Sequence, residues 1–179
     1  AADAAGPVQY AGGAACSSCH PKQVTLWRGS HHDLAMQPAD EGTVLGDFDG
    51  ATLVHFGVTS SFFRKDGEHI VRTEGPDGEL HQYEIKYTFG VDPLQQYLVE
   101  FPGGRLQALS IAWDTRPADK GGQRWYHLYP GERIAHDDEL HWTRPGQNWN
   151  SVCAECHSTH LEKNYDSVTR TFSTTWSEI

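Results

Sequence analysis

The sequence predicts an α+β fold in which an antiparallel β domain is inserted between two helical or loop segments. Its 179 residues are 37% hydrophobic, which suffices for one domain with its own core. Each end of the chain carries a C-x-x-C-H box, at residues 16–20 and 153–157. Between the boxes, apolar and polar residues alternate from Thr43 onward, and this period of two is typical of half-buried strands.

A short helix is expected directly after the first box. Pro21 suits a first helical turn, and Val24 and Trp27 share one helical face. Gly29 then provides a stop signal. The helix is therefore expected to span about two turns.

The middle of the chain is expected to form strands joined by hairpin-like turns. The alternation is clearest in Tyr83–Phe89, where every second side chain can face a core. Turn signals lie between such runs at Asp66-Gly67 and at Pro76-Asp77-Gly78. The predicted strands are 51–57, 68–74, 79–89, 95–102, 105–113 and 124–129.

Two further elements are expected near the C-terminus. Asn148 is a candidate cap for a short helix that runs through Trp149 into the second box. The threonine-rich stretch Val168–Trp176 predicts one more strand. We therefore expect a single domain made of residues 1–42, 43–130 and 131–179, with the β insertion in the middle.

The two boxes contain every cysteine of the chain, namely Cys16, Cys19, Cys153 and Cys156. C-x-x-C-H is the attachment signature of c-type haem. Its two thiols bond the porphyrin vinyl groups, and the histidine, here His20 or His157, lies beneath the iron as proximal ligand. Paired C-x-x-C elements also hold zinc or form disulfides, but neither needs a histidine after both second cysteines. The sequence therefore predicts two covalent c-type haems, so that both flanking segments are haem-bearing.

The chain has eleven histidines, so nine remain as candidates for the far side of each iron. Those near the first box are His31 and His32, with Met36 as an alternative sulfur ligand or a core side chain. Those near the second box are His127, His136, His141 and His160. For the histidines of the strand region, ordinary surface or half-buried positions are favoured over ligation; these are His55, His69 and His81.

The order C-x-x-C-H followed by Trp27-x-x-Ser30-x-His32 resembles multihaem c-type cytochromes of the tetrahaem cytochrome c and hydroxylamine-oxidoreductase-related group. The chain is still more similar to the haem domain of bacterial multihaem cytochromes that continue into tetratricopeptide repeats. The strings that carry this likeness are Ser30–Met36, Tyr87–Val91, Tyr97–Arg105, Leu140–Thr143 and Asn148–Asn150.

The resemblance implies bis-histidine irons, with His32 as distal ligand at one and His141 at another. His31 and His136 are the second choices, and a ligand from one end of the chain can also serve the haem of the other. Similar proteins continue into further haem boxes and repeats, whereas this sequence ends at Ile179. It is either a two-haem version or the N-terminal piece of a longer protein.

Composition and charge indicate where such a protein works and what it meets. Its net charge of −10 makes nucleic acid an unsuitable partner and favours basic redox proteins or other haem-bearing chains. No stretch is long and apolar enough to span a membrane. Because haem is attached outside the cytoplasm, and Ala1–Pro7 resembles a processed N-terminus, we expect a periplasmic or extracellular protein.

Three functions are compatible with these features. Electron transfer by a carrier that is not an enzyme is favoured, because surplus histidines can fill both axial positions of each iron. A haem oxidoreductase for a small nitrogen or oxygen species would need an open iron and acid–base groups such as Arg124, His127 or His160. The third function is a haem-stapled assembly module. Boxes at opposite ends of the sequence also make head-to-tail self-assembly into a filament conceivable.

Overall fold

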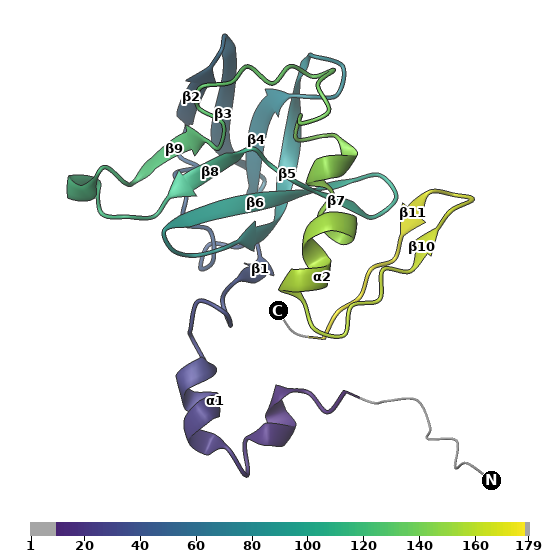
Figure 1. The fold of residues 1–179 in the computed structure, drawn as a ribbon. Coiled ribbons are helices and arrows are strands. Elements are labelled where there is room, and N and C mark those ends of the chain that lie inside the picture. The colour runs from purple at the N-terminus through teal and green to yellow at the C-terminus, as the bar shows by residue number, and fades with distance from the viewer. Residues whose placement is uncertain (1–9, 178–179) are drawn as a thin grey trace.

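A computed structural model describes residues 10–177 and shows a nearly closed antiparallel barrel (Figure 1). The molecule is 36% strand and only 15% helix, so the predicted α+β class is wrong and the fold is mostly β. In the described part of the chain the α-helices are α1 (Pro21–Trp27) and α2 (Ala154–His157). Long helices are absent there because the flanking segments are interrupted by loops, with Gly29 (φ 72°) just past α1 and Ser158 extended after α2.

The main sheet has the strand order β2-β3-β4-β5-β6-β8-β9, with β1 paired to β5 and β7 paired to β6. All of these pairs are antiparallel. Strands β10 and β11 form a separate hairpin. The bounds are β1 Met36–Pro38, β2 Ala51–His55, β3 Val58–Lys65, β4 Glu68–Glu74, β5 Leu80–Phe89, β6 Leu94–Phe101, β7 Arg105–Ala108, β8 Ile111–Asp114, β9 Arg124–His127, β10 Tyr165–Asp166 and β11 Thr171–Phe172.

Each predicted strand corresponds to an observed one, but the short strands β1 and β10 were not predicted. Strand β3 was not predicted either; Phe56 and Gly57, both at positive φ, turn the chain so that Val58–Lys65 folds back on β2. The predicted strand 105–113 is divided into β7 and β8. The predicted strand over Val168–Trp176 is confirmed only as the two residues of β11.

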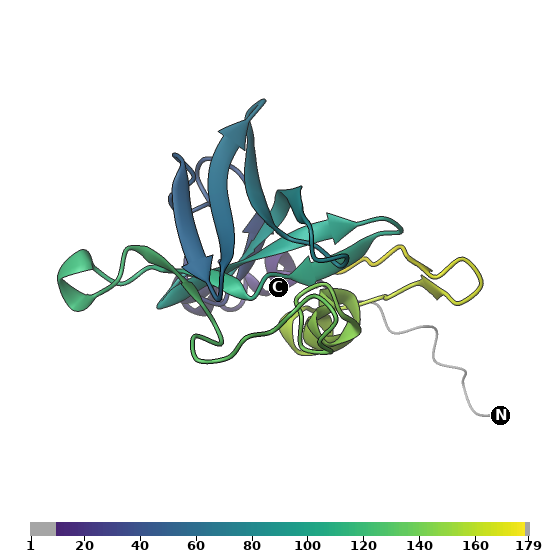
Figure 2. The same ribbon diagram turned by 90° about the horizontal axis from the view of Figure 1, so that it is seen from above.

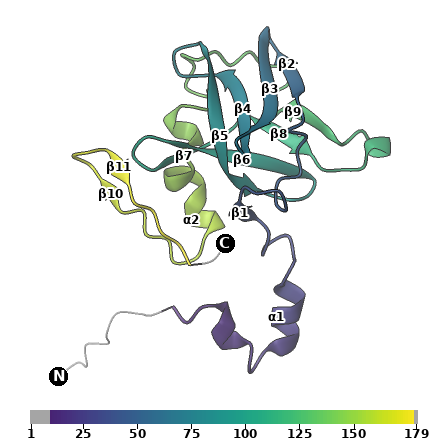
Figure 3. The same cartoon turned by 180° about the vertical axis from the view of Figure 1, so that it is seen from behind.

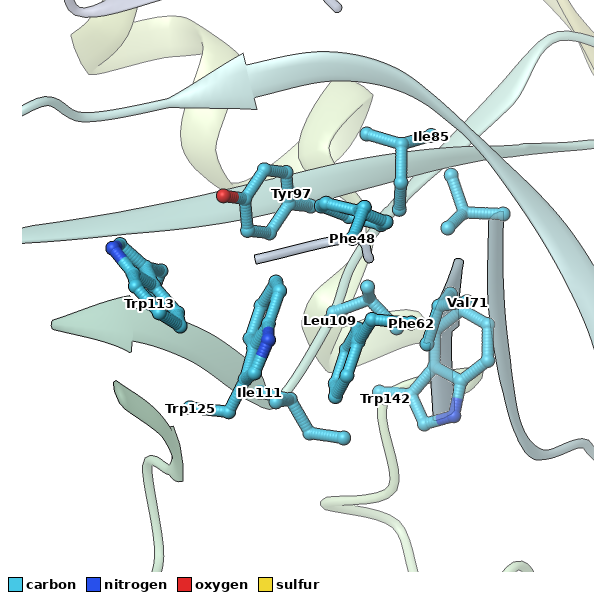
Figure 4. Packing of buried hydrophobic residues seen from close by; sticks show 11 residues of the cluster. Phe48, Phe62, Val71, Ile85, Tyr97, Leu109, Ile111, Trp113, Trp125 and Trp142 are labelled. Carbon is cyan, nitrogen blue, oxygen red and sulfur yellow. The ribbon is translucent and has the colours of Figure 1, made fainter. Parts of the chain in front are cut away.

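Strand β6 is buried on both faces, because its alternate side chains enter two different clusters. Tyr97 and Val99 belong to the cluster inside the barrel, whereas Leu98 belongs to a second cluster outside it. Inside, Phe62 stacks on Trp125 at 3.7 Å between ring centroids, and Phe48 meets both rings edge-on. Figure 4 shows these side chains pointing toward one another from several strands.

The outer cluster attaches the second C-x-x-C-H box to the barrel. Trp149, four residues before Cys153, and Ala154, directly after it, are fully buried there against Leu98, Leu106 and other apolar side chains. Seen from above, the coil that leads into α2 lies beside the sheet and not within it (Figure 2). Met36 is 6% exposed in the same cluster, so the structure gives it the place of a core side chain.

The predicted first segment, residues 1–42, contributes strand β1 to the sheet. The three-part division of the domain stays a prediction. The Ala1–Pro7 stretch, which was expected to be a processed N-terminus, lies outside the described residues. Among the described residues, no helix is long and apolar enough to cross a membrane.

Candidate functional site

The first box lies on an arm that hangs from the barrel through β1 (Figure 3). A single 3₁₀ turn, Gly13–Cys16, leads into it, and the His20 N–H donates to the Cys16 carbonyl at 2.8 Å. Helix α1 follows at once, with Pro21 at its first position as predicted. The box is therefore wound into one compact turn that holds Cys16 and His20 close together.

A cavity of about 470 Å³ opens beside this turn. Its lining is Gly13, Ala14, Cys16, His20, Gln23, Val24, Trp27 and Arg28. A thiol, an imidazole and the predicted apolar face of α1 therefore meet in one place. Cys16 and Cys19 are free thiols on the surface, so both are available for thioether bonds.

Helix α1 itself buries no side chain, and Trp27 is 41% exposed. A seven-residue helix without tertiary packing is marginal in water. A planar apolar group in the cavity would cover Val24 and Trp27 and provide the missing packing. The residues of the first box therefore fit a covalently attached haem.

The second box is wound more firmly onto the barrel. The Asn148 side chain accepts a hydrogen bond from the Ser151 N–H at 3.0 Å, which confirms the predicted cap. Residues Trp149–Cys153 form a π-helical turn that continues into α2. Cys156 and His157 are exposed, and the His157 ring meets Phe89 edge-on at 4.9 Å.

Cys153 differs from the other cysteines because it is half-buried. Burial, and next the neighbouring Cys156, raise the pKa of the Cys153 thiol. It contacts the outer cluster around Trp149, so the second box has an apolar bed on one side and open surface on the other. These residues also fit a covalently attached haem.

The first box lies below the barrel in the views of Figures 1 and 3, and the second, in α2, lies beside the lower part of the barrel. Tyr10, six residues before the first box begins, stacks on His160, three residues after the second box ends. Their ring centroids are 4.3 Å apart and their planes differ by 17°. The fold thus brings into contact two segments that flank the boxes and are far apart in the sequence.

The predicted distal histidines lie elsewhere. His31 and His32 are exposed in the turn between α1 and β1, and neither lines the cavity of the first box. His141 is 4% exposed, and it lines a different cavity together with His136. No residue of the second box lines that cavity. The roles of all four as iron ligands stay predictions.

This second cavity, which we call the histidine cavity, has a volume of about 310 Å³. Four histidines line it, namely His55, His127, His136 and His141. Apolar side chains including Leu109, Ile111 and Trp142 form much of the wall. Between residues 10 and 177, no three His, Cys, Asp or Glu side chains converge as metal ligands.

Two of these histidines join β2 to the end of β9, where the barrel closes. We call this junction of His55, His127 and Tyr129 the seam. His55 Nε2 donates to the Tyr129 carbonyl at 3.1 Å, and the Tyr129 N–H donates to His127 Nδ1 at 3.1 Å. The two imidazoles stack at 3.8 Å with planes 7° apart. The two rings thus hold the backbone N–H and C=O of one residue, Tyr129, in an arrangement that requires His127 Nδ1 to be unprotonated.

This seam predicts a specific acid sensitivity. Burial, and next the neighbouring His55, lower the pKa of His127 to about 4 from an ordinary value near 6.5. The unfolded chain therefore takes up the proton first as the pH falls, and the contribution of a neutral His127 is lost between about pH 6.5 and pH 4. After allowance for partial exposure, we expect a loss of about 1–2 kcal/mol in the free energy of unfolding.

Urea unfolding at a series of pH values measures this effect. His127→Asn supplies an oxygen acceptor that does not titrate, so its stability curve should be flatter than that of the wild type in the same window. His81→Asn is the control, because His81 is exposed and lies away from the seam. Parallel curves for His127→Asn and the wild type would refute the assignment.

Sequence patterns do not mark two residues that shape this region. Glu74 ends β4 inside the histidine cavity, and Tyr129 lies just after β9. Only the folded barrel brings them next to His141 and His55, respectively. Of the three sequence-based acid–base candidates, His127 lines the histidine cavity, whereas Arg124 and His160 do not.

A comparison with known protein families finds a match in the first segment. The family described as cytochrome c554 and c-prime matches residues 15–45, which include the first box, His32 and β1. The match supports a c-type cytochrome with covalently bound haem c and a haem-based role in electron transfer. No curated protein and no solved structure is significantly similar to the chain.

Proposed function

We propose that the chain is a dihaem c-type cytochrome that transfers electrons outside the cytoplasm, in the periplasm or beyond the cell. The observation that carries the proposal is the repetition of one arrangement. Each box is a helical turn with cysteines and a histidine at the surface and apolar side chains beside them. Haem c, when bound, supplies reversible one-electron chemistry at its iron.

The residues of this chain attach and position the two groups. Cys16 and Cys19 hold the first haem and Cys153 and Cys156 the second, with His20 and His157 as proximal ligands. For the distal position at the first iron we propose His32, with His31 as the second choice. Both are exposed on the arm that carries the first box, so neither ring is enclosed by the barrel.

The position of His141, and of His136 as its alternative, limits which iron each can bind. Because no residue of the second box lines the histidine cavity, an iron bound by His141 has to enter that cavity. The haem of another chain, or a further haem box, meets this condition more directly than the second box does. The structure therefore does not place His141 or His136 at the iron of the second box.

Two observations favour a carrier over an enzyme. His127, an acid–base candidate, has both its stacking face and its Nδ1 engaged in the seam. His160 is engaged with Tyr10 and Ser177. The alternatives remain a haem oxidoreductase for a small nitrogen or oxygen species and a haem-stapled assembly module.

A visible spectrum of the reduced holoprotein, recorded with and without carbon monoxide, tests the carrier. We expect two low-spin haems whose spectrum does not change with carbon monoxide, because two axial ligands leave no open position. A high-spin iron that binds carbon monoxide in the native protein would favour the oxidoreductase instead.

We further propose that its partners are redox proteins with basic docking surfaces or other haem-bearing chains. The net charge of −10 favours encounter with a basic surface. Head-to-tail assembly is a finer proposal, which size-exclusion chromatography and electron microscopy of the holoprotein can test. Since the first box lies below the barrel and the second beside its lower part in Figures 1 and 3, a haem-to-haem contact between chains would involve that side of the molecule.

A further inference from the structure

The arm that carries the first box, residues 10–35, is attached to the rest of the molecule at both of its ends. At one end the Ala35 carbonyl accepts a hydrogen bond from the Gly90 N–H at 2.6 Å, and Met36 follows in the outer cluster. At the other end Tyr10 stacks on His160. Between residues 14 and 34, the hydrogen bonds that the structure describes all join residues of the arm itself. The arm is therefore a loop that is held at its two ends.

Both attachments lie next to the second box. Met36 shares the outer cluster with Cys153, and its partner in the β1–β5 pair, Phe89, meets the His157 ring edge-on at 4.9 Å. His160 follows His157 by three residues. In Figure 3 the arm runs down from β1 through α1 and back toward the coil that follows α2. The segment with the first box thus leaves and rejoins the molecule beside the second box.

The surroundings of His160 hold its ring in place for this contact. His160 Nδ1 lies 3.0 Å from Ser177 Oγ, and the Ser177 N–H donates to the Thr159 carbonyl at 2.9 Å. The His160 backbone is left-handed, with φ 54°, a region in which glycine and asparagine are the usual residues. A histidine at such a position has a backbone cost that a contact of its side chain can offset. The stack with Tyr10 is that contact.

From this arrangement we propose that Tyr10 and His160 form a clasp that closes the arm and holds the first haem at a fixed place beside the second. The proposal rests on the proposed function, because it requires two haems. In this role the two residues position a haem and do not bind its iron. Electron exchange between two haems falls steeply as their separation grows. A closed arm keeps that separation short and constant, whereas an arm attached only through β1 lets the first haem move away.

Electron exchange within the half-reduced holoprotein tests the clasp, and proton NMR of the haem methyl groups measures it. Tyr10→Ala removes one ring of the stack, and His160→Asn removes the other with a residue that suits the left-handed backbone. An aromatic pair shifts the balance between closed and open arm by up to about tenfold, so we expect each variant to slow the exchange by up to about tenfold. The double variant should be no slower than either single one.

Two matched variants separate the clasp from a general loss of aromatic surface. Tyr10→Phe keeps the ring and should retain the wild-type exchange rate. Tyr165→Ala removes a tyrosine that is similarly exposed, 50% against 58% for Tyr10, and that contacts Phe172 within the β10–β11 hairpin. It should also leave the rate unchanged. Amide exchange in residues 14–34 should accelerate in Tyr10→Ala and His160→Asn but not in these two controls.

Three results would overturn the clasp. These are a wild-type rate of electron exchange in Tyr10→Ala, a Tyr10→Phe variant as slow as Tyr10→Ala, and a changed low-spin spectrum in His160→Asn, which would make His160 an iron ligand. The denatured mass and the low-spin spectrum keep the two proposals apart. If the wild type and Tyr10→Ala both hold two low-spin haems and exchange electrons equally fast, the clasp fails and the electron-transfer proposal stands. A wild type without two haems overturns both.

Discussion

Replacing Cys153 and Cys156 together by Ser is expected to leave one covalent haem per chain. A serine oxygen does not form the thioether bond, and the first box lies on a different segment with its own cavity. The double variant Cys16→Ser/Cys19→Ser should lose the other haem, and the quadruple variant should lose both. The mass of the denatured protein, with haem staining of a denaturing gel, counts the haems directly.

The two double variants should differ in stability although each loses one haem. The second box is part of the outer cluster, because Cys153 packs beside Trp149 and Ala154. The first box is followed by a helix that buries no residue. We therefore expect a lower melting temperature for the second-box variant than for the first-box variant. Two haems retained after the loss of either box would contradict the assignment of the cysteines.

The features that the sequence predicts correctly depend on residues that are close together along the chain. Asp66-Gly67 and Gly78 have the positive φ values that their hairpin turns require, and the alternation in Tyr83–Phe89 falls within β5. Asn148 caps the turn that leads into the second box for the same reason, since a cap depends only on residues two or three positions away.

The fold class could not be predicted in this way because barrel closure is non-local. The seam joins β2 to the end of β9 through His55, His127 and the Tyr129 backbone, and His55 lies more than seventy positions before the other two residues. None of these residues has a distinctive local pattern. Strand β3 was missed for a related reason, because Ser60 and Phe62 become core residues only when the barrel has formed around them.

In the candidate site, too, the local features were predictable from the sequence and the non-local ones were not. Spacing alone identifies both boxes, whereas the burial of His141 depends on how the chain from β9 to Asn148 crosses the barrel mouth. A histidine near the second box in sequence therefore faces another cavity in space. Met36 is similar, because its place in the outer cluster follows from the pairing of β1 with β5.

Trp149→Ala is expected to cause the largest loss of stability among single substitutions near the second box. Trp149 is fully buried, belongs to the outer cluster, and meets Trp176 edge-on at 5.1 Å. Removing a buried indole costs about 3–5 kcal/mol, through lost transfer free energy and the cavity left behind. The turn that carries Cys153 should loosen with it, so amide exchange in residues 149–157 should accelerate.

Two matched variants separate packing from other effects of the indole. Trp149→Phe should cost far less, because it retains most of the packing and the indole Nε1 that it removes has no hydrogen-bond partner. Trp27→Ala makes the same change on α1, which buries no residue against the barrel, and should lower the free energy of unfolding by less than Trp149→Ala does. Urea unfolding of the four proteins measures the differences. Equal losses for Trp149→Ala and Trp27→Ala would show that the outer cluster does not anchor the second box.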